Sequence, residues 1–237
     1  VQTEMGGKNA AVVLADADLE AAAAQIVPGV FGVTGQRCTS NTRLVVERSV
    51  AGDLIAEVVR LAEKIKVGDP LDPTVRMGPL VTGTARDTVN REVAEAVEAG
   101  ATALTGGLPY DSGMLAEGYF APPSVLELPG TGLPLWRREV FGPVLAVVRA
   151  DGPEHALALA NDSEYGLSGA IFTRDLGTVL DAIDTFDVGV LHVNTSSAGA
   201  DLHVPFGGEK GSGFGPKEQG RAPREFYTRT TTVYLRG

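Results

Sequence analysis

The chain has a single cysteine, a deficit of positive charge and no long apolar run, and each shortage excludes a class of protein. One Cys among 237 residues leaves no internal disulfide, which fits a reducing cytosol. Lys and Arg number 20 against 30 Asp and Glu, and the formal charge of −10 argues against non-specific nucleic-acid binding. No apolar run approaches the ~20 residues that cross a bilayer. We therefore expect a cytoplasmic protein that binds neither nucleic acid nor membranes.

Periodicity along the chain predicts alternating helices and strands. The composition, with 43% hydrophobic and 21% charged residues, is that of a globular protein with a full core. Apolar residues spaced by three and four predict helices, and short β-branched runs predict strands. The helices are expected over 19–31 with a kink or break at Pro28 and Gly29, over 54–65, over 89–99 with Val89, Val93 and Val97 on one stripe, over 153–160 and over 176–186; the strands are expected over 42–46, 101–104, 144–148, 168–172 and 189–194. This alternation predicts an α/β fold, a doubly wound and mostly parallel sheet with helices on both faces.

The two ends of the chain have their own patterns. Residues 4–9 include a tight Gly-Gly turn with no leading strand before it, so they are typical of the middle of a domain. We expect the chain to be the later part of a longer protein. Residues 226–235 alternate between apolar and polar side chains, which predicts a strand. No partner strand lies near it in the sequence, so it is expected to pair elsewhere.

Cys38 is the strongest candidate for a catalytic residue. A lone cysteine is usually a small buried hydrophobe, but this one lies in a loop rich in Gly, Gln and Thr, beside Arg37. A neighbouring cation and backbone N–H groups lower the pKa of a thiol and favour the nucleophilic thiolate. We therefore predict that Cys38 is a nucleophile.

Two carboxylates are weaker candidates when each is taken alone. Glu4 precedes a Gly-Gly pair, where the backbone turns sharply and little bulk shields the carboxylate. A nucleophilic cysteine makes Glu4 a candidate base, because a thioester intermediate needs a base to activate water. Glu139 and Phe141 lie on one side of an extended segment ahead of an apolar strand, although a loop charge followed by a core Phe explains this pair at least as well.

Two further patterns are not interpreted as sites of their own. Gly211-x-Gly213 lacks the following helix and the acidic residue of a dinucleotide-binding loop, so 205–213 is interpreted as a flexible active-site loop. The histidines do not cluster with carboxylates or with Cys38 at metal-ligand spacing, and no metal site is predicted. They are His155, His192 and His203.

Taken together, the motifs resemble those of the NAD(P)-dependent aldehyde dehydrogenase superfamily. Five motifs occur in the family's order: Glu4-Met5-Gly6-Gly7-Lys8, Gly35-Gln36-Arg37-Cys38-Thr39, Glu139-Val140-Phe141-Gly142-Pro143, Asn161-x-x-x-Tyr165-Gly166-Leu167-Ser168 and Pro205-Phe206-Gly207-Gly208. The interval from Glu4 to Cys38, 38 − 4 = 34 residues, also matches the family's pattern. Met5 stands where the family usually has Leu, which is a volume-conserving change.

The resemblance implies how the chain is divided and what accompanies it. Residues 1–210 would form a catalytic domain, and 211–237 a C-terminal loop and an oligomerisation strand of a homodimer or homotetramer. An N-terminal Rossmann-like coenzyme domain would precede residue 1, bind most of the NAD or NADP and add an Asn to the oxyanion hole. Without that domain, the isolated chain is expected to show negligible dehydrogenase activity.

The resemblance also implies roles for individual residues. Cys38 would attack the aldehyde, its N–H would help to hold the oxyanion, and Glu4 would activate water to hydrolyse the thioester. Glu139 would bind the nicotinamide ribose and Phe141 would flank the ring. The residues expected at the coenzyme are Glu139, Phe141, Met5 and Gly6, and those expected to shape substrate access are Val33, Arg37, Asn194 and Phe206.

The substrate and two alternative functions stay open at this point. Residues 194–199, 205–208 and 218–221 are similar to the 2-oxoglutarate-semialdehyde (2,5-dioxopentanoate) dehydrogenases, which implies an acidic semialdehyde as substrate. The choice between NAD and NADP is not fixed by this chain. One alternative is a non-catalytic interaction module. The other is a thiol acyltransferase or thioester hydrolase that uses Cys38 and Glu4, which leaves Glu139 and Phe141 unexplained.

Overall fold

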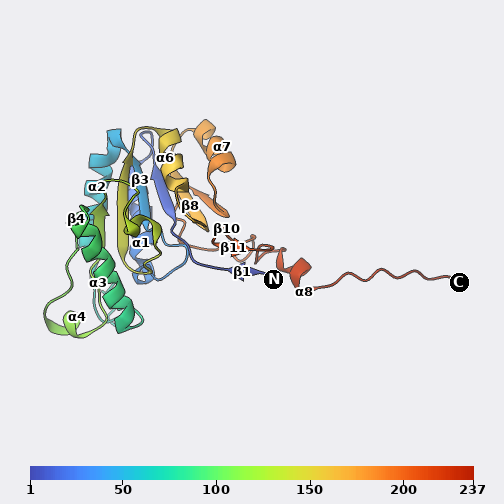
Figure 1. Ribbon diagram of the computed structural model, residues 1–237, viewed down its shortest axis with the longest axis horizontal. Helices are drawn as coiled ribbons and strands as arrows, with labels where there is room; N and C mark the ends of the chain where they lie inside the picture. The colour runs from blue at the N-terminus through green and yellow to red at the C-terminus, as the bar shows by residue number, and fades with distance from the viewer.

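A seven-stranded sheet forms the centre of the computed structural model, which describes residues 1–237 (Figure 1). The strand order is β4-β5-β6-β3-β2-β8-β9, and all neighbours are parallel except β4 and β5. The strands are β2 (Ala10–Val13), β3 (Arg43–Glu47), β4 (Thr102–Thr105), β5 (Ser124–Glu127), β6 (Val144–Ala150), β8 (Ser168–Phe172) and β9 (Val190–Val193). The predicted α/β fold with a mostly parallel sheet is confirmed.

Helices cover both faces of this sheet. One core lies under α1 (Leu19–Phe31) and α2 (Arg48–Glu63), and the other under α3 (Gly83–Glu98), α5 (Pro134–Arg137), α6 (Pro153–Asn161) and α7 (Leu176–Thr185). Strand β2 supplies both cores, since Ala10 and Val12 point to the second core and Ala11 and Val13 to the first. A parallel strand buried on both faces has a continuous apolar sequence rather than an alternating one. No helix is both long and apolar enough to span a membrane.

Several short elements hold the loops around one end of the sheet. β1 (Thr3–Glu4) pairs with β11 (Gly213–Phe214), and β7 (Tyr165–Gly166) pairs with β10 (Glu209–Lys210). A 3₁₀ turn, η1 (Gly32–Gly35), follows α1, and α4 (Gly113–Glu117) lies in the connection between β4 and β5. The first ladder holds the glycine-rich segment 205–215 against the first residues of the chain, and the second holds it against residues 165–166.

Of the kink or break that the sequence predicts at Pro28 and Gly29, a break does not occur, and helix α1 continues to Phe31. Proline removes the hydrogen bond to the carbonyl four residues earlier, which here belongs to Ala24. Ala24 and Pro28 both lie on the exposed side of the helix, so water can satisfy that carbonyl. Gly29 lies on the buried side, where a side chain would overlap Ser196.

Other predicted elements agree with the structure to different degrees. Strand β8 has the predicted bounds, whereas β2 and β5 were not predicted. In α3 the buried stripe includes Val89 and Val93 but not Val97, which is 41% exposed; Glu92 and Ala96 complete the stripe instead.

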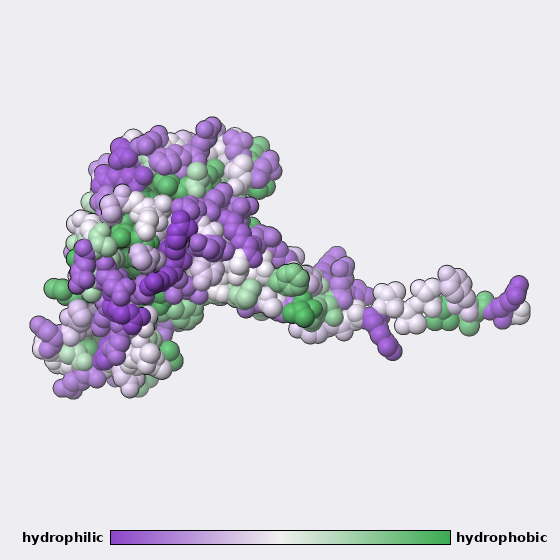
Figure 2. All heavy atoms as spheres, viewed as in Figure 1, coloured by the Kyte–Doolittle hydropathy of each residue, from purple (hydrophilic) through white to green (hydrophobic).

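The C-terminal segment differs from the predicted strand over 226–235. A short helix, α8 (Pro223–Tyr227), includes its first two residues, and the following residues form an arm that leaves the body of the molecule (Figure 1). Figure 2 shows hydrophobic side chains along this arm, and Val233, Tyr234 and Leu235 are largely exposed. Within the chain the arm has no strand partner. Its role as an oligomerisation strand stays a prediction, as does the division at residue 210.

Candidate active site

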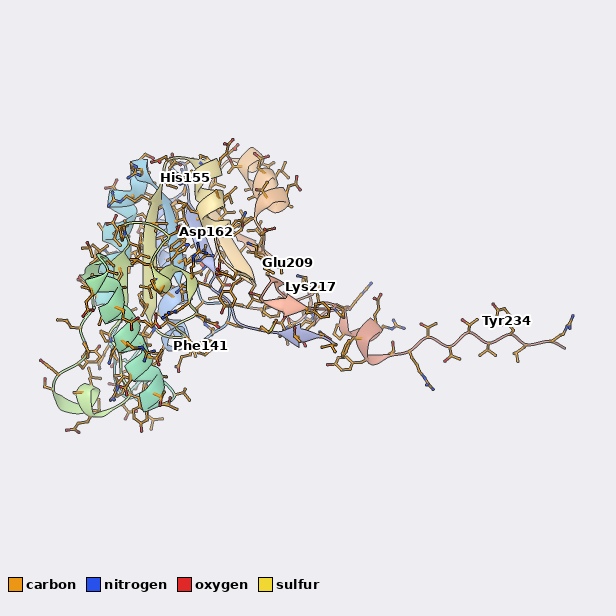
Figure 3. The ribbon with its side chains drawn as sticks, viewed as in Figure 1. Phe141, His155, Asp162, Glu209, Lys217 and Tyr234 are labelled. Atoms are coloured by element: carbon orange, nitrogen blue, oxygen red, sulfur yellow. The ribbon has the colours of Figure 1, made fainter.

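Three loops meet at the amino end of the parallel strands. The Gly6-Gly7 turn leads into β2, the loop with Cys38 into β3, and the segment 139–142 into β6. Because β6, β3 and β2 are consecutive in the sheet, these loops lie side by side. Figure 3 shows Phe141 at this end of the sheet and His155 at the opposite end.

The Gly6-Gly7 turn connects the candidate coenzyme carboxylate to the nucleophile loop. The Gly7 N–H donates to Glu139 Oε1 at 3.1 Å. A Cβ on Gly6 would overlap Glu139 Oε2, and a Cβ on Gly7 would lie 2.6 Å from the carbonyl oxygen of Cys38. Both positions therefore need glycine for steric reasons. Gly6 and Gly7 therefore contact both the Glu139 carboxylate and the backbone of Cys38.

The loop that carries Cys38 also contacts the segment 139–142 directly. Gly35 has a φ of +69°, and a Cβ there would overlap the carbonyl of Gly142. The two residues before it, Val33 and Thr34, also have positive φ, at 53° and 58°. Two consecutive β-branched residues in this region are strained. Thr34 is held in place by its hydroxyl, which donates to the Gly78 carbonyl at 3.1 Å.

The half-buried Cys38 thiol does not have the lowered pKa that the sequence predicts. Its pKa is raised by burial and by the carboxylates of Glu4 and Glu139. The N–H groups of Cys38 and Thr39 act in the opposite direction, but they do not outweigh these causes. Both carboxylates thus lie close enough to act on the sulfur, and the resting thiol is protonated at neutral pH.

Arg37 attracts the Cys38 thiolate, but this attraction is not among the main influences on the thiol pKa. Its guanidinium donates to the carbonyl of Pro28 at 3.0 Å and to that of Ala198 at 3.1 Å. The side chain therefore ties the end of α1 to the segment 195–199. Sequence proximity to Cys38 suggested an activating role, but the side chain is used as a structural clamp.

Glu4 lies against the glycine-rich segment 207–208. Although this residue is exposed, partial desolvation and the neighbouring Glu218 raise its pKa, while the Gly208 N–H and Lys217 lower it. Lys217 donates to the Gly207 carbonyl at 2.7 Å and to Glu209 at 2.9 Å, and Figure 3 shows these two charged side chains together. A carboxylate with a raised pKa is a better base for water than an ordinary surface glutamate.

Glu139 is a partly buried carboxylate at the same end of the sheet. Burial raises its pKa, whereas the Gly7 N–H and Lys8 lower it. Its Oε1 accepts a hydrogen bond from the Gly7 N–H, and its Oε2 lies against Gly6, where any side chain would overlap it. Phe141, two residues later, has a φ of 55° and is 44% exposed. Glu139 therefore has a partly buried acceptor carboxylate, and an exposed aromatic side chain follows it two residues later.

Two buried cations beneath these loops were missed in the sequence. Lys8 is only 1% exposed, and its pKa falls to about 7 because of burial and of the charge on Arg43. Arg43 is also buried; it donates to the carbonyls of Lys8 at 2.6 Å and Ala160 at 2.9 Å and lies over the Trp136 ring. Nothing in the sequence distinguishes these cations from surface charges, because their burial depends on which strands are neighbours.

The remaining predicted site residues are not all brought together. Met5 and Val33 are exposed near this end of the sheet, at 45% and 64%. Phe206 is buried where its backbone pairs with Glu218. Asn194 is not at the site, because its side-chain amide binds both backbone groups of Thr173 after β8, at the carboxyl end of the sheet.

Comparison with known proteins supports the sequence resemblance. The model of the aldehyde dehydrogenase family matches residues 1–233. The alpha-ketoglutaric semialdehyde dehydrogenase of Bacillus subtilis (strain 168) is 37% identical over 235 residues, which are 99% of this chain and 48% of that protein. This chain therefore spans about half the length of the curated relatives that it matches.

Solved structures agree with this result. HpcC from Thermus thermophilus matches with a TM-score of 0.90 and 35% identity, over 99% of this chain and 47% of that one. The betaine aldehyde dehydrogenase of Staphylococcus aureus, solved in complex with NAD+, matches with a TM-score of 0.91 and 32% identity, over 95% and 44%. The resemblance inferred from the five motifs is confirmed.

Proposed function

Because the chain belongs to the aldehyde dehydrogenase family, we propose that it is the cysteine-bearing half of an enzyme that oxidises an aldehyde to a carboxylic acid with NAD or NADP. The observation that carries the proposal is the contact of three loops at the amino end of the sheet. Gly6 and Gly7 pack against both the Glu139 carboxylate and the backbone of Cys38, and the charge of Glu139 acts on the thiol. The binding of NAD+ by a structural relative supports this coenzyme class.

Cys38 carries the covalent chemistry. Once deprotonated, its sulfur attacks the aldehyde carbon, a C–S bond forms and the carbonyl oxygen takes the negative charge. The N–H groups of Cys38 and Thr39, which already face the sulfur, lie where they can donate to that oxygen. The oxygen lone pair then re-forms the C=O bond as the hydride departs, which leaves a thioester on Cys38.

The coenzyme supplies the hydride acceptor when it is bound. Glu139 would hold it by accepting hydrogen bonds from the nicotinamide ribose, while Oε1 already accepts the Gly7 N–H. Phe141 offers its exposed ring to the nicotinamide, and Met5 and Gly6 line the same approach. A fixed carboxylate limits the movement of the riboside and keeps the acceptor carbon near Cys38.

Glu4 carries out the second half of the reaction. It takes a proton from water, the oxygen attacks the thioester carbon, and the C–S bond breaks to release the acid and the Cys38 thiolate. Its raised pKa makes the carboxylate a stronger base, and its charge acts on Cys38. Its seat against 207–208 leaves the carboxylate open to solvent.

An acidic semialdehyde, such as 2-oxoglutarate semialdehyde, is the substrate that we propose. The support is the similarity of residues 194–199, 205–208 and 218–221 to the 2-oxoglutarate-semialdehyde dehydrogenases, together with the 37% identity to the Bacillus subtilis enzyme. Arg37 gives no support, because its guanidinium is bound to two carbonyls. The test is kcat/KM for the full-length enzyme on this aldehyde and on betaine aldehyde. A preference of tenfold or more for the neutral or cationic aldehyde, about 1.4 kcal/mol in the transition state, removes the substrate proposal.

Replacing Cys38 by Ala in the full-length context tests the reaction itself. NADH formation from aldehyde should be abolished, while NAD binding measured by calorimetry stays intact, because only the sulfur forms the covalent intermediate. Retained turnover contradicts the proposal. Thioester hydrolysis without any coenzyme dependence would instead identify a thioesterase or acyltransferase.

A further inference from the structure

The nucleophile loop is fastened by two buried asparagines that the reaction does not use directly. Asn9, 2% exposed, is the residue before β2. Its amide nitrogen donates to the carbonyl of Cys38 at 2.7 Å and to that of Ser40 at 2.9 Å. Its Oδ1 accepts the backbone N–H of Ser168 at 3.1 Å, at the start of β8. One side chain thus joins the nucleophile loop to two neighbouring strands.

The first of these contacts fixes the direction of a peptide group. The carbonyl of Cys38 and the N–H of Thr39 belong to one planar trans peptide, so they point in opposite directions. When Asn9 holds the oxygen, the N–H at the other end is directed toward the Cys38 sulfur, where it acts on the thiol. Gly7 closes the remaining space around the oxygen, since a Cβ there would lie 2.6 Å from it.

We propose that Asn9 is a positioning residue for Cys38: its amide holds the Cys38 carbonyl so that the Thr39 N–H faces the sulfur. This inference rests on the proposed role of Cys38 as the nucleophile. It adds that the donor near the sulfur is aimed by a side chain 29 residues earlier in the sequence. Loss of Asn9 frees the peptide to rotate and removes a donor from the thiolate.

Asn41 is a matched control within the same loop. It is also fully buried and also uses both ends of its amide, donating to the Ser197 hydroxyl at 2.7 Å and accepting from the Ser197 N–H at 3.2 Å. None of these contacts involves the peptide between Cys38 and Thr39. Substitution of Asn41 therefore costs a similar amount of buried hydrogen bonding without releasing the aimed N–H.

The experiment measures the rate of Cys38 alkylation by iodoacetamide from pH 7 to 11.5, quantified on the Cys38 peptide by mass spectrometry. The variants are Asn9→Ala, Asn9→Asp, Asn41→Ala and Asn41→Asp. Asn9→Asp keeps the shape and the acceptor for Ser168 but cannot donate to Cys38. Asn41→Asp shows the effect of a new charge alone. Circular dichroism and thermal midpoints identify variants that do not fold.

We expect both Asn9 variants to raise the pH midpoint of alkylation by about one unit, the size of one hydrogen bond to a charged group. Asn41→Ala should keep the midpoint of the wild type, and Asn41→Asp should shift it less than Asn9→Asp. A wild-type midpoint in a folded Asn9 variant, or an equal shift in Asn41→Ala, overturns the proposal. The assay needs neither aldehyde nor coenzyme, so its failure is distinguishable from failure of the proposed dehydrogenase reaction.

Discussion

Replacing the buried Lys8 by Met should change how the stability of the protein depends on pH. Lys8 is 1% exposed, and its pKa is lowered to about 7 by burial and by Arg43, against the attraction of Glu139 and Glu92. In an unfolded chain a lysine titrates near pH 10.4. Between these two values the unfolded chain binds a proton that the folded chain does not. The free energy of unfolding therefore rises with pH across this window.

The size of the effect follows from the proton difference. A full difference of one proton changes the free energy of unfolding by about 1.4 kcal/mol per pH unit. With a folded pKa of about 7, Lys8 should raise the stability by roughly 2 kcal/mol between about pH 8 and pH 9.5. Met has a similar unbranched shape and no charge, so Lys8→Met removes this slope while keeping the packing.

Urea unfolding at several pH values checks this prediction, with the fluorescence of Trp136 as the signal. Trp136 is the only tryptophan and is fully buried, so it reports on the core beneath the site. Lys64→Met serves as the control, because Lys64 is exposed at the end of α2. Its pH dependence should match that of the wild type. If Lys8→Met keeps the slope of the wild type, Lys8 is charged in the folded protein and the reasoning fails.

Three further predictions address catalysis, backbone strain and assembly. In the full-length enzyme, Glu139→Gln should mainly slow hydride transfer, whereas Glu4→Gln should mainly slow release of the acid. Single-turnover kinetics that show the same slowed step in both variants would refute these separate roles. Val33→Asn should raise the free energy of unfolding by about 1 kcal/mol, because Val33 is exposed and Asn tolerates its positive φ. Val81→Asn, at another exposed position, should not raise it. An unchanged urea midpoint for Val33→Asn would show that Val33 is not strained. The chain of residues 1–237 alone should self-associate through its exposed apolar surface and arm and show negligible NADH formation, and a monodisperse monomer in light scattering, or clear turnover, contradicts this.

The sequence predicts those parts of the fold that carry a long or distinctive pattern. Strand β8 was bounded correctly because five apolar and small residues end at turn-forming ones. Strand β2 was missed because Ala10 and Ala11 are poor strand formers and because its four apolar residues show no alternation between apolar and polar side chains. Its position is fixed by burial between β3 and β8, which only the assembled sheet supplies. The absence of a break at Pro28 has a similar origin, since the exposure of Ala24 is a tertiary property.

The candidate site shows the same limit. Motif resemblance identified Cys38, Glu4 and Glu139 as the residues to examine, and in the structure both carboxylates act on the Cys38 thiol. It gave no orientation for the side chains: Arg37 turns toward Pro28 and Ala198, and Asn194 caps Thr173. These outcomes depend on contacts between residues far apart in the sequence, which a local pattern does not encode.

The segment 6–9 explains why so many of these contacts depend on one turn. Gly6 leaves room for Glu139, Gly7 donates to Glu139 and packs on the Cys38 carbonyl, and the Asn9 amide donates to that carbonyl. Lys8, between them, is buried and acts on the charge of Glu139. Nucleophile and coenzyme carboxylate are thus positioned by four consecutive residues that enter a central strand. Substitutions within this segment should therefore couple, because each shifts the support of the same peptide and the same carboxylate.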